Sequence, residues 1–291
     1  MNDNKGLTMR VAAITVNNLF GVFDHSIELN AEDRITIIYG PNGFGKTFTL
    51  TLVDELLNPS CESYQAISGI PFGNLAVSFD DGRFLSLEKN DTGEAVELRF
   101  KLSSQHGLVE SFVYDNEPST LDREPEWLDT LKQSIYVRFI HTERIKPLTA
   151  DSWRDFNAAM RSFAAEDSEK VVLYADIINN RFMHKDVSVT KEEGLVISTV
   201  DGRKLPPEFL SSGEQHVLYL YFELLFNIGP DSLILIDEPE LSLHILWQQE
   251  FLKDLGRILA LADFDILIAT HSPQIIHDRW DLAVELKGPD A

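Results

Sequence analysis

Gly40-Pro-Asn-Gly-Phe-Gly-Lys-Thr47 is the stretch that decides the fold. Before it lies the apolar run Ile35 to Tyr39, which is typical of a strand. After it, Thr47 to Leu57 carries apolar residues at helical spacing until Asn58-Pro59 stops the helix. A strand, a glycine loop and a helix in this order are what a phosphate-binding loop requires. The glycines let backbone N–H groups turn toward phosphate, and the helix start adds its positive end.

Each residue of this loop has an expected role. Lys46 supplies a mobile cation to the phosphates, and Thr47 supplies a hydroxyl ligand to Mg²⁺. The residues expected to contact ATP here are Gly40, Pro41, Asn42, Gly43, Phe44, Gly45, Lys46 and Thr47. From average residue frequencies, a chance match is expected in only about one unrelated chain of this length in a hundred. The sequence therefore predicts ATP binding with Mg²⁺.

A second segment, Leu233-Ile-Leu-Ile-Asp-Glu-Pro239, is an apolar strand that ends on two adjacent carboxylates. Ligands of α/β sheets bind at the carboxyl ends of the strands. We therefore expect Asp237 to bind Mg²⁺ through water, and Glu238 to accept a proton from the attacking water or to orient it. If this segment stood alone, it would be better explained as a structural strand followed by an acidic turn. Together with the phosphate loop, the segment indicates a catalytic site.

Two further segments carry weaker signals. Leu210-Ser-Ser-Gly-Glu-Gln215 places small polar residues before an apolar helix, where free N–H groups bind anions. The same residues are equally typical of an ordinary helix cap. Ala269-Thr-His-Ser-Pro273 ends an apolar strand with His271, which could donate a hydrogen bond to a γ-phosphate. A single histidine at a strand end more often has a structural role.

Composition narrows the class of protein. The chain has 291 residues, 44% of them apolar, so it can build a large core. No apolar run approaches the roughly 18 residues of a membrane helix, and residues 1–10 lack the apolar stretch of a signal peptide. We therefore expect a cytoplasmic protein with no membrane contact. Cys61 is the single cysteine and cannot form an internal disulfide. A formal net charge of -22 disfavours unaided binding to nucleic acid.

The remaining pattern predicts antiparallel hairpins followed by a parallel sheet. From Asn74 to Val113, apolar runs alternate with turn signals, and from His216 onward strands alternate with helices. The other predicted strands are Val11 to Val16, Ser26 to Leu29, Ile135 to Ile140 and Ile266 to Ala269, with a hairpin at Val187 to Val200. The other predicted helices are Ser152 to Ala165, Lys170 to Asn180, His216 to Ile228 and Ile245 to Leu261. A polar stretch, Asn116 to Glu126, separates the hairpins from the rest.

Taken in this order, the four segments resemble the ABC-type ATPases. The resemblance implies a Walker A loop at Gly40 to Thr47, a signature motif at Leu210 to Gln215, a Walker B strand ending in Asp237-Glu238, a D-loop at Leu241 to His244 and a switch histidine at His271. It also implies an α/β fold: an ABC-type P-loop ATPase with a mixed core sheet, an antiparallel β subdomain and a helical insert. The catalytic residues would be Lys46, Glu238 and His271.

In that family, two subunits share their ATP sites. The signature of one subunit completes the site of the other, so the resemblance implies a homodimer. Ser211 and Gly213 would face the γ-phosphate bound by the partner, and Ser212 and Glu214 belong to the same expected nucleotide-binding set. Ser212 stands where the commonest signature has a second glycine, which leaves less room for a close backbone approach.

Within the family, two phrases are similar to a soluble branch. Glu238-Pro-Glu-Leu-Ser-Leu-His244 and Ser211-Ser-Gly-Glu-Gln-His216 resemble OLD-type proteins, the ATPases of Septu and retron-associated antiviral systems and, more distantly, RecF and SMC proteins. Between Thr47 and Ser211 lie 163 residues, more than the compact insert of a transporter subunit needs. No glutamine is a convincing Q-loop residue. Gln65 and Gln133 are candidates, and Glu143 and Arg144 are alternatives.

We expect one bilobal domain over residues 1–291, with an N-lobe to about 145, a helical insert at about 150–185 and a C-lobe from about 186. The sequence ends shortly after His271, without the nuclease domain of OLD proteins. Our first hypothesis is therefore an ATPase that controls a separately encoded effector, a nuclease, in antiphage defence. The alternative is a RecF- or SMC-like ATPase of DNA repair or tethering. A transporter subunit is disfavoured by the long insert.

Overall fold

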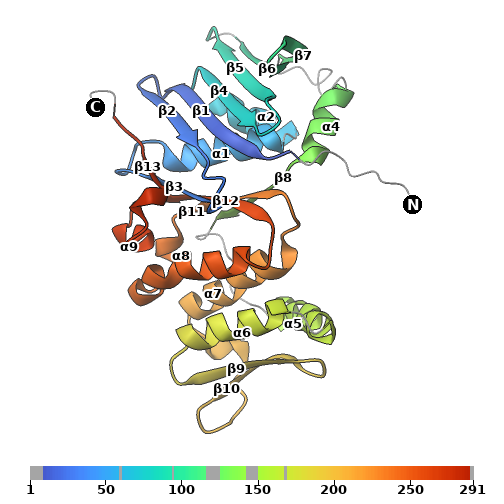
Figure 1. Ribbon diagram of the computed structural model, residues 1–291, viewed down its shortest axis with the longest axis vertical. Helices are drawn as coiled ribbons and strands as arrows, with labels where there is room; N and C mark the ends of the chain where they lie inside the picture. Colours follow the sequence, from blue (N-terminus) through green and yellow to red (C-terminus); the bar gives the residue numbers. More distant parts are fainter. Residues whose placement is uncertain are drawn as a thin grey trace.

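The computed structural model describes residues 9–58, 61–93, 95–115, 125–141, 150–166 and 169–288. The chain is built in layers along its longest axis (Figure 1). An antiparallel sheet lies at one end, followed by a helix, a parallel sheet, a further layer of helices and a two-stranded hairpin at the other end. Within the described ranges, no helix has the length and apolar character needed to cross a membrane.

The central sheet is parallel and positions the site. Its strands lie in the order β13 (Ala283–Glu285), β3 (Ile35–Tyr39), β12 (Phe264–Thr270), β11 (Ser232–Asp237) and β8 (Tyr136–His141), and each neighbouring pair is parallel. Leu233 and Leu235 belong to the core on one face of this sheet, and Ile234 and Ile236 belong to the core on the other. Because both faces are covered, β11 consists almost wholly of apolar residues.

The antiparallel sheet packs against the side of α1 (Lys46–Leu57) that faces away from the parallel sheet. Its strands lie in the order β2 (Phe23–Glu28), β1 (Val11–Leu19), β4 (Asn74–Phe79), β5 (Phe84–Asp91), β6 (Val96–Ser104) and β7 (Gly107–Tyr114). Leu50 and Val53 of α1 share one core with Ile14 and Val77 of this sheet and with Leu235. The helices α2 (Cys61–Gly69) and α4 (Glu126–Ser134) add Tyr64, Leu128 and Leu131 to the same core.

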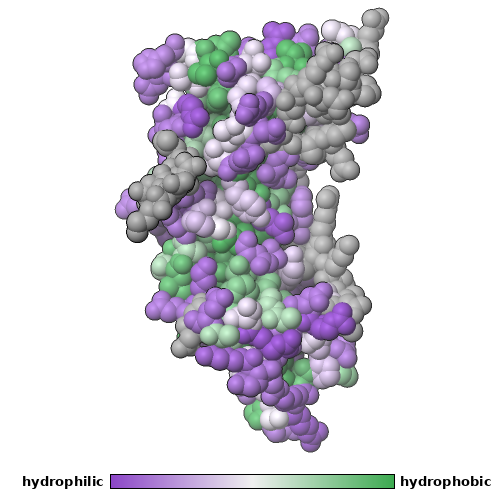
Figure 2. Space-filling view, turned by 90° about the vertical axis from the view of Figure 1, so that its right-hand side faces the viewer, coloured by the Kyte–Doolittle hydropathy of each residue, from purple (hydrophilic) through white to green (hydrophobic). Residues whose placement is uncertain are grey.

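The second core lies beyond the parallel sheet. Its helices are α5 (Ala150–Ala165), α6 (Glu169–Arg181), α7 (Ser212–Phe222), α8 (Ile245–Leu259) and α9 (Pro273–Ile276), with the hairpin of β9 (Lys185–Thr190) and β10 (Gly194–Thr199). A π-helical turn, Glu223–Asn227, continues α7, and short 3₁₀ turns lie at Pro207–Phe209, Pro239–Leu241 and Trp280–Leu282. On the face shown in Figure 2, the hairpin end of the molecule is mainly hydrophilic.

The predicted α/β fold is confirmed, with one refinement. The core sheet, expected to be mixed, is wholly parallel among its described strands, and the expected antiparallel β subdomain is a separate sheet. The predicted strands and helices are present with ends moved by a few residues, whereas α2 and α4 were not predicted. Residues 116–124 of the predicted polar separator lie outside the described residues, and its last residue, Glu126, begins α4.

Candidate active site

The glycine loop joins β3 to α1. Gly43 and Gly45 have φ angles of +87° and +82°, a conformation that side chains rarely adopt. A Cβ atom on Gly45 would also lie 2.4 Å from Leu19 Cδ2 of β1. Helix α1 has no side-chain cap and no acidic residue in its first turn. Its first N–H groups are therefore available to an anion held by the loop.

Lys46 is buried at the start of α1, with a relative exposure of 5%. Its Nζ donates hydrogen bonds to the carbonyl oxygens of Gly40 and Pro41, at 2.7 Å and 3.0 Å. Burial lowers the pKa of Lys46, and the charges of Glu238, Glu240 and Asp237 act in the opposite direction. The loop thus keeps its cation among carbonyl oxygens and close to three carboxylates.

Thr47 and Asp237 come together across the sheet, although 190 positions separate them in the chain. Thr47 Oγ1 donates a hydrogen bond to Asp237 Oδ1 at 3.0 Å. Burial raises the pKa of Asp237 to about 6, against the lowering effect of that hydrogen bond. A hydroxyl and a carboxylate are the hard oxygen donors that Mg²⁺ takes, usually alongside water and substrate phosphates. These residues therefore fit the cation of a magnesium nucleotide.

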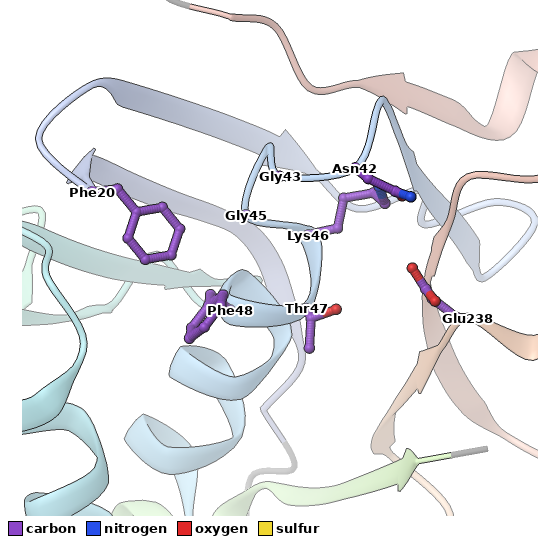
Figure 3. A pocket seen from close by; sticks show the side chains of 8 residues that line it. All are labelled: Phe20, Asn42, Gly43, Gly45, Lys46, Thr47, Phe48 and Glu238. Carbon is purple, nitrogen blue, oxygen red and sulfur yellow. The ribbon is translucent and has the colours of Figure 1, made fainter. Parts of the chain in front are cut away.

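A cavity of about 200 Å³ lies over the loop. Its lining residues are Phe20, Asn42, Gly43, Gly45, Lys46, Thr47, Phe48 and Glu238, with Glu238 reaching toward the loop from the opposite side (Figure 3). The rings of Phe20 and Phe48 meet edge to face at 5.0 Å. The sequence motifs did not indicate that these two rings line the cavity. The exposed position of Phe48 on α1 is consistent with such a role.

Glu238 follows β11 in a strained backbone conformation. Its φ of 44° and ψ of 58° are left-handed, which is uncommon outside glycine, and its N–H donates to the carbonyl of Ala269 at 2.8 Å. His271, which follows β12, places Nδ1 3.5 Å from Glu238 Oε1. The two residues expected to act on the attacking water and on the γ-phosphate thus lie side by side.

Glu240 is a residue of this site that the motifs did not single out. Its Oε1 accepts hydrogen bonds from Thr270 Oγ1 at 2.6 Å and from the backbone N–H groups of His271 and Ser272 at 2.9 Å and 3.1 Å. His271 Nδ1 lies 3.0 Å from the same oxygen. The side chain is only 6% exposed. The sequence did offer one signal, the second acid of Glu-Pro-Glu. It gave no sign of the groups that bond to this acid in the folded chain.

The signature segment begins α7 with a capping box. Ser211 Oγ accepts a hydrogen bond from the N–H of Glu214, whose Oε2 accepts from the N–H and the hydroxyl of Ser211 at 2.8 Å and 2.9 Å. Lys185 Nζ of β9 donates to the other oxygen, Oε1. Burial alone would raise the pKa of Glu214, but the hydrogen bonds from Lys185 and Ser211 lower it overall. The carboxylate of Glu214 therefore orders this turn from within.

Ser211 and Gly213 line a second cavity of about 340 Å³. Its other lining residues are Arg181, Met183, Glu214, His244, Leu246 and Trp247, none of which lines the cavity over the phosphate loop. A Cβ atom on Gly213 would make only ordinary contacts, at 3.6 Å and 3.8 Å. In the expected D-loop, Leu241 is exposed, Ser242 and Leu243 are buried, and His244 caps α8.

Other expected residues lie apart from the cavity. The ring of Phe44 packs 5.4 Å from that of Phe23, and its carbonyl accepts a hydrogen bond from His25 Nε2 at 2.8 Å, so Phe44 would contribute only its backbone. Gln65 is exposed on α2, and Gln133 is exposed on α4, which precedes β8. Glu143 and Arg144 lie outside the described residues.

Comparison with known proteins agrees with this geometry. Residues 35–277 match the model of the family described as "AAA domain, putative AbiEii toxin, Type IV TA system". The chain belongs to this family. Membership confirms the predicted ABC-type P-loop ATPase domain, which implies ATP binding.

Relatives and solved structures that are similar to this chain include the following. Septu protein PtuA of Bacillus thuringiensis is 22% identical over 310 residues, covering 91% of this chain and 72% of PtuA. A nucleotide-binding protein of Saccharophagus degradans is 28% identical over 141 residues, covering 48% of this chain and 44% of the relative. The SMC head domain from Thermotoga maritima has 18% identity and a TM-score of 0.51, covering 94% of this chain and 92% of the head. That last likeness shows the fold alone.

Proposed function

We propose that the chain hydrolyses Mg-ATP as a homodimer. In each site, the loop from Gly40 to Thr47 holds the phosphates, and Thr47 and Asp237 hold Mg²⁺. Glu238 orients the attacking water or takes its proton, and His271 donates to the γ-phosphate. The contact between Thr47 and Asp237 supports the cation site, since it brings two oxygen donors together at the start of α1.

One observation carries the homodimer. The phosphate loop and the signature turn line two cavities that share no residue, so one chain alone offers two half-sites. Gly213 has no packing reason to be a glycine, since a Cβ atom there would be accommodated. An open glycine at a helix start suits the close approach of a phosphate held by a second copy.

Mixing two inactive variants tests this arrangement. Lys46→Ala removes the phosphate cation, and Gly213→Asp adds a carboxylate where the partner's phosphate would lie. An aspartate in the first turn of α7 also suits the helix dipole, so this variant should fold. After subunit exchange at equal amounts, half of the dimers carry one intact composite site. We expect about one quarter of wild-type ATPase activity from the mixture and almost none from either variant alone.

The control for this mixture is Gly256→Ala in α8, where a Cβ atom would meet nothing within 4 Å. It should keep full activity and dimerise normally. No recovery in a mixture shown by native mass spectrometry to contain heterodimers would mean that each chain hydrolyses ATP alone.

We further propose that the ATP state controls a separately encoded nuclease in antiphage defence. The likeness to Septu protein PtuA over most of the chain supports this role, as does the resemblance to ATPases of antiviral systems. The test is affinity purification of the native chain as wild type, Glu238→Gln and Lys46→Ala. A nuclease should be enriched with one nucleotide state over the other. Salt-sensitive recovery of DNA without a nuclease would instead favour the RecF- or SMC-like alternative.

A further inference from the structure

His141 ends β8 at the edge of the parallel sheet where the site lies. In register, it is the partner of Asp237 on the neighbouring strand β11. Parallel strands carry their ligands at their carboxyl ends. In this sheet β3 leads into the phosphate loop, β11 ends on Asp237, and β12 is followed by His271. The end of β8 is the remaining position beside Asp237 at this edge.

His141 and Asp237 also share a face of the sheet. Paired residues of neighbouring parallel strands point to the same side, and side chains alternate along each strand. Val137 and Phe139 are the partners of Leu233 and Leu235, and all four belong to or pack against the core that contains α1. The ring of His141 lies 3.8 Å from that of Phe139, which places it on this same face.

This face carries the start of α1. Thr47 Oγ1, in the first turn of that helix, bonds to Asp237 Oδ1. Neighbouring strands are about 4.8 Å apart, and an imidazole extends several ångströms from its backbone. His141 is therefore within reach of groups bound beside Asp237. In Figure 3, β8 is the pale green strand that runs below α1.

We propose that His141 is a nucleotide-site residue that contacts the cation and γ-phosphate end of bound Mg-ATP. A ring nitrogen of His141 hydrogen bonds to the γ-phosphate, on the side of Asp237 away from His271. The contact between the tilted rings of His141 and Phe139 holds its orientation. This inference rests on the proposed function. It assigns the position beside Asp237 to a histidine, whereas the sequence motifs had left Gln65 and Gln133 as candidates for the Q-loop residue.

The experiment compares nucleotides that differ at the γ-phosphate. Calorimetry would measure binding of the non-hydrolysable analogue AMP-PNP and of ADP, each with MgCl₂ or with EDTA. The chains are wild type, His141→Ala, His141→Gln and the control His106→Ala, which lies in the exposed turn between β6 and β7. Thermal unfolding of each chain identifies any variant that fails to fold, and His141→Gln provides the conservative second substitution.

His141→Ala should weaken Mg-AMP-PNP binding by about tenfold or more, the loss expected for a hydrogen bond to a charged group. Binding of ADP, which lacks a γ-phosphate, should change by less than about twofold with MgCl₂ or with EDTA. His141→Gln, which still donates and accepts, should recover most of the affinity. Equal weakening of ADP and Mg-AMP-PNP, or no change in either, would overturn the inference while leaving the proposed ATPase intact. Wild type that binds no nucleotide would overturn both.

Discussion

At the scale of single residues, Asp237 combines a proposed ligand role with an energetic penalty. Its pKa is raised from 3.8 to about 6, mainly by burial. Between those two values the folded chain binds a proton that the unfolded chain releases, so this group favours folding at low pH. The folded state loses that contribution as the pH rises from about 4 to about 6. Above pH 6 the folded chain keeps an ionised carboxylate in a site that favours its neutral form.

Asp237→Asn should therefore stabilise the protein while abolishing Mg-dependent turnover. Asparagine keeps the oxygen that accepts from Thr47 and removes the charge. At pH 7.5 we expect the free energy of unfolding to rise by about 1 to 2 kcal/mol, a value reduced for partial solvent access. Urea unfolding at pH 7.5 and at lower pH measures this, and the gain should shrink as the pH falls through 6.

Asp263→Asn provides a control of opposite sign. Hydrogen bonds from Arg34 and Arg10 lower the pKa of Asp263, so its ionised form favours the folded state. Its replacement should destabilise the chain at pH 7.5, with the difference vanishing as the pH falls below the ordinary aspartate range. If Asp237→Asn is no more stable than wild type at pH 7.5, the penalty assigned to this carboxylate is wrong.

At the scale of elements, Glu240 ties the segment after β11 to the segment after β12. Four groups of the β12 end, from Thr270 to Ser272, lie within hydrogen-bonding distance of one of its oxygens. Ser272 Oγ also donates a hydrogen bond to Gln248 Oε1 of α8 at 2.9 Å. Gln248 Nε2 in turn donates to the backbone carbonyl of Glu240 at 3.3 Å. The position of His271 relative to Glu238 therefore depends on this buried carboxylate.

Glu240→Ala should lower kcat by about tenfold or more, because hydrogen bonds to a charged group are worth about 1.5 to 3 kcal/mol each. Nucleotide affinity should change by less than about threefold, since Glu240 does not line the cavity over the loop. Steady-state ATPase assays and nucleotide titrations separate the two effects. Glu240→Gln keeps an acceptor for the backbone N–H groups and should recover part of kcat.

The comparison variant is Glu250→Gln, whose carboxylate pairs with Lys253 on the exposed side of α8. Both its activity and its stability should match those of wild type. A fall in nucleotide affinity as large as the fall in kcat for Glu240→Ala would show that Glu240 supports the whole fold of the site rather than the placement of His271.

Elements with a strong local pattern were predictable. The strand before Gly40 and helix α1 follow from apolar spacing alone, because neighbouring residues determine which face is buried. The sequence places a helix stop at Asn58-Pro59, yet α2 begins at Cys61. In α4, Leu128 and Leu131 join the core from among polar neighbours. Helix α7 begins at Ser212, four residues before the predicted start, because Ser211 caps it.

The candidate site was predictable where chemistry and sequence are adjacent. Lys46, Thr47 and Asp237 each belong to a segment whose residues follow one another in the chain. Glu240, Phe20 and His141 acquire a place near the site only through sheet register and the packing of distant segments. A local pattern carries no information about which strands become neighbours, so these residues required the folded chain.

At the scale of the whole molecule, net charge sets the conditions for assembly. Each chain carries a formal charge of -22, so two copies repel one another at long range. Exposed apolar side chains near the signature segment would oppose that repulsion in the proposed homodimer: Leu241, Ile245 and Leu246 are 52%, 54% and 62% exposed. A homodimer formed across these surfaces would rest on short-range contacts and on Mg-ATP, against an unfavourable long-range field.

Salt should therefore strengthen the proposed homodimer. In Glu238→Gln with Mg-ATP, we expect the dimer dissociation constant to fall by about threefold or more between about 50 and about 300 mM NaCl, because screening shortens the range of the repulsion. Sedimentation equilibrium measures this, with Lys46→Ala as the variant whose dimer should be weaker, because it lacks the cation that holds the phosphates. Binding to DNA would weaken over the same range, since it depends on ion release from phosphates. A dimer that dissociates as salt rises would instead place opposite charges across the interface and refute the apolar contact.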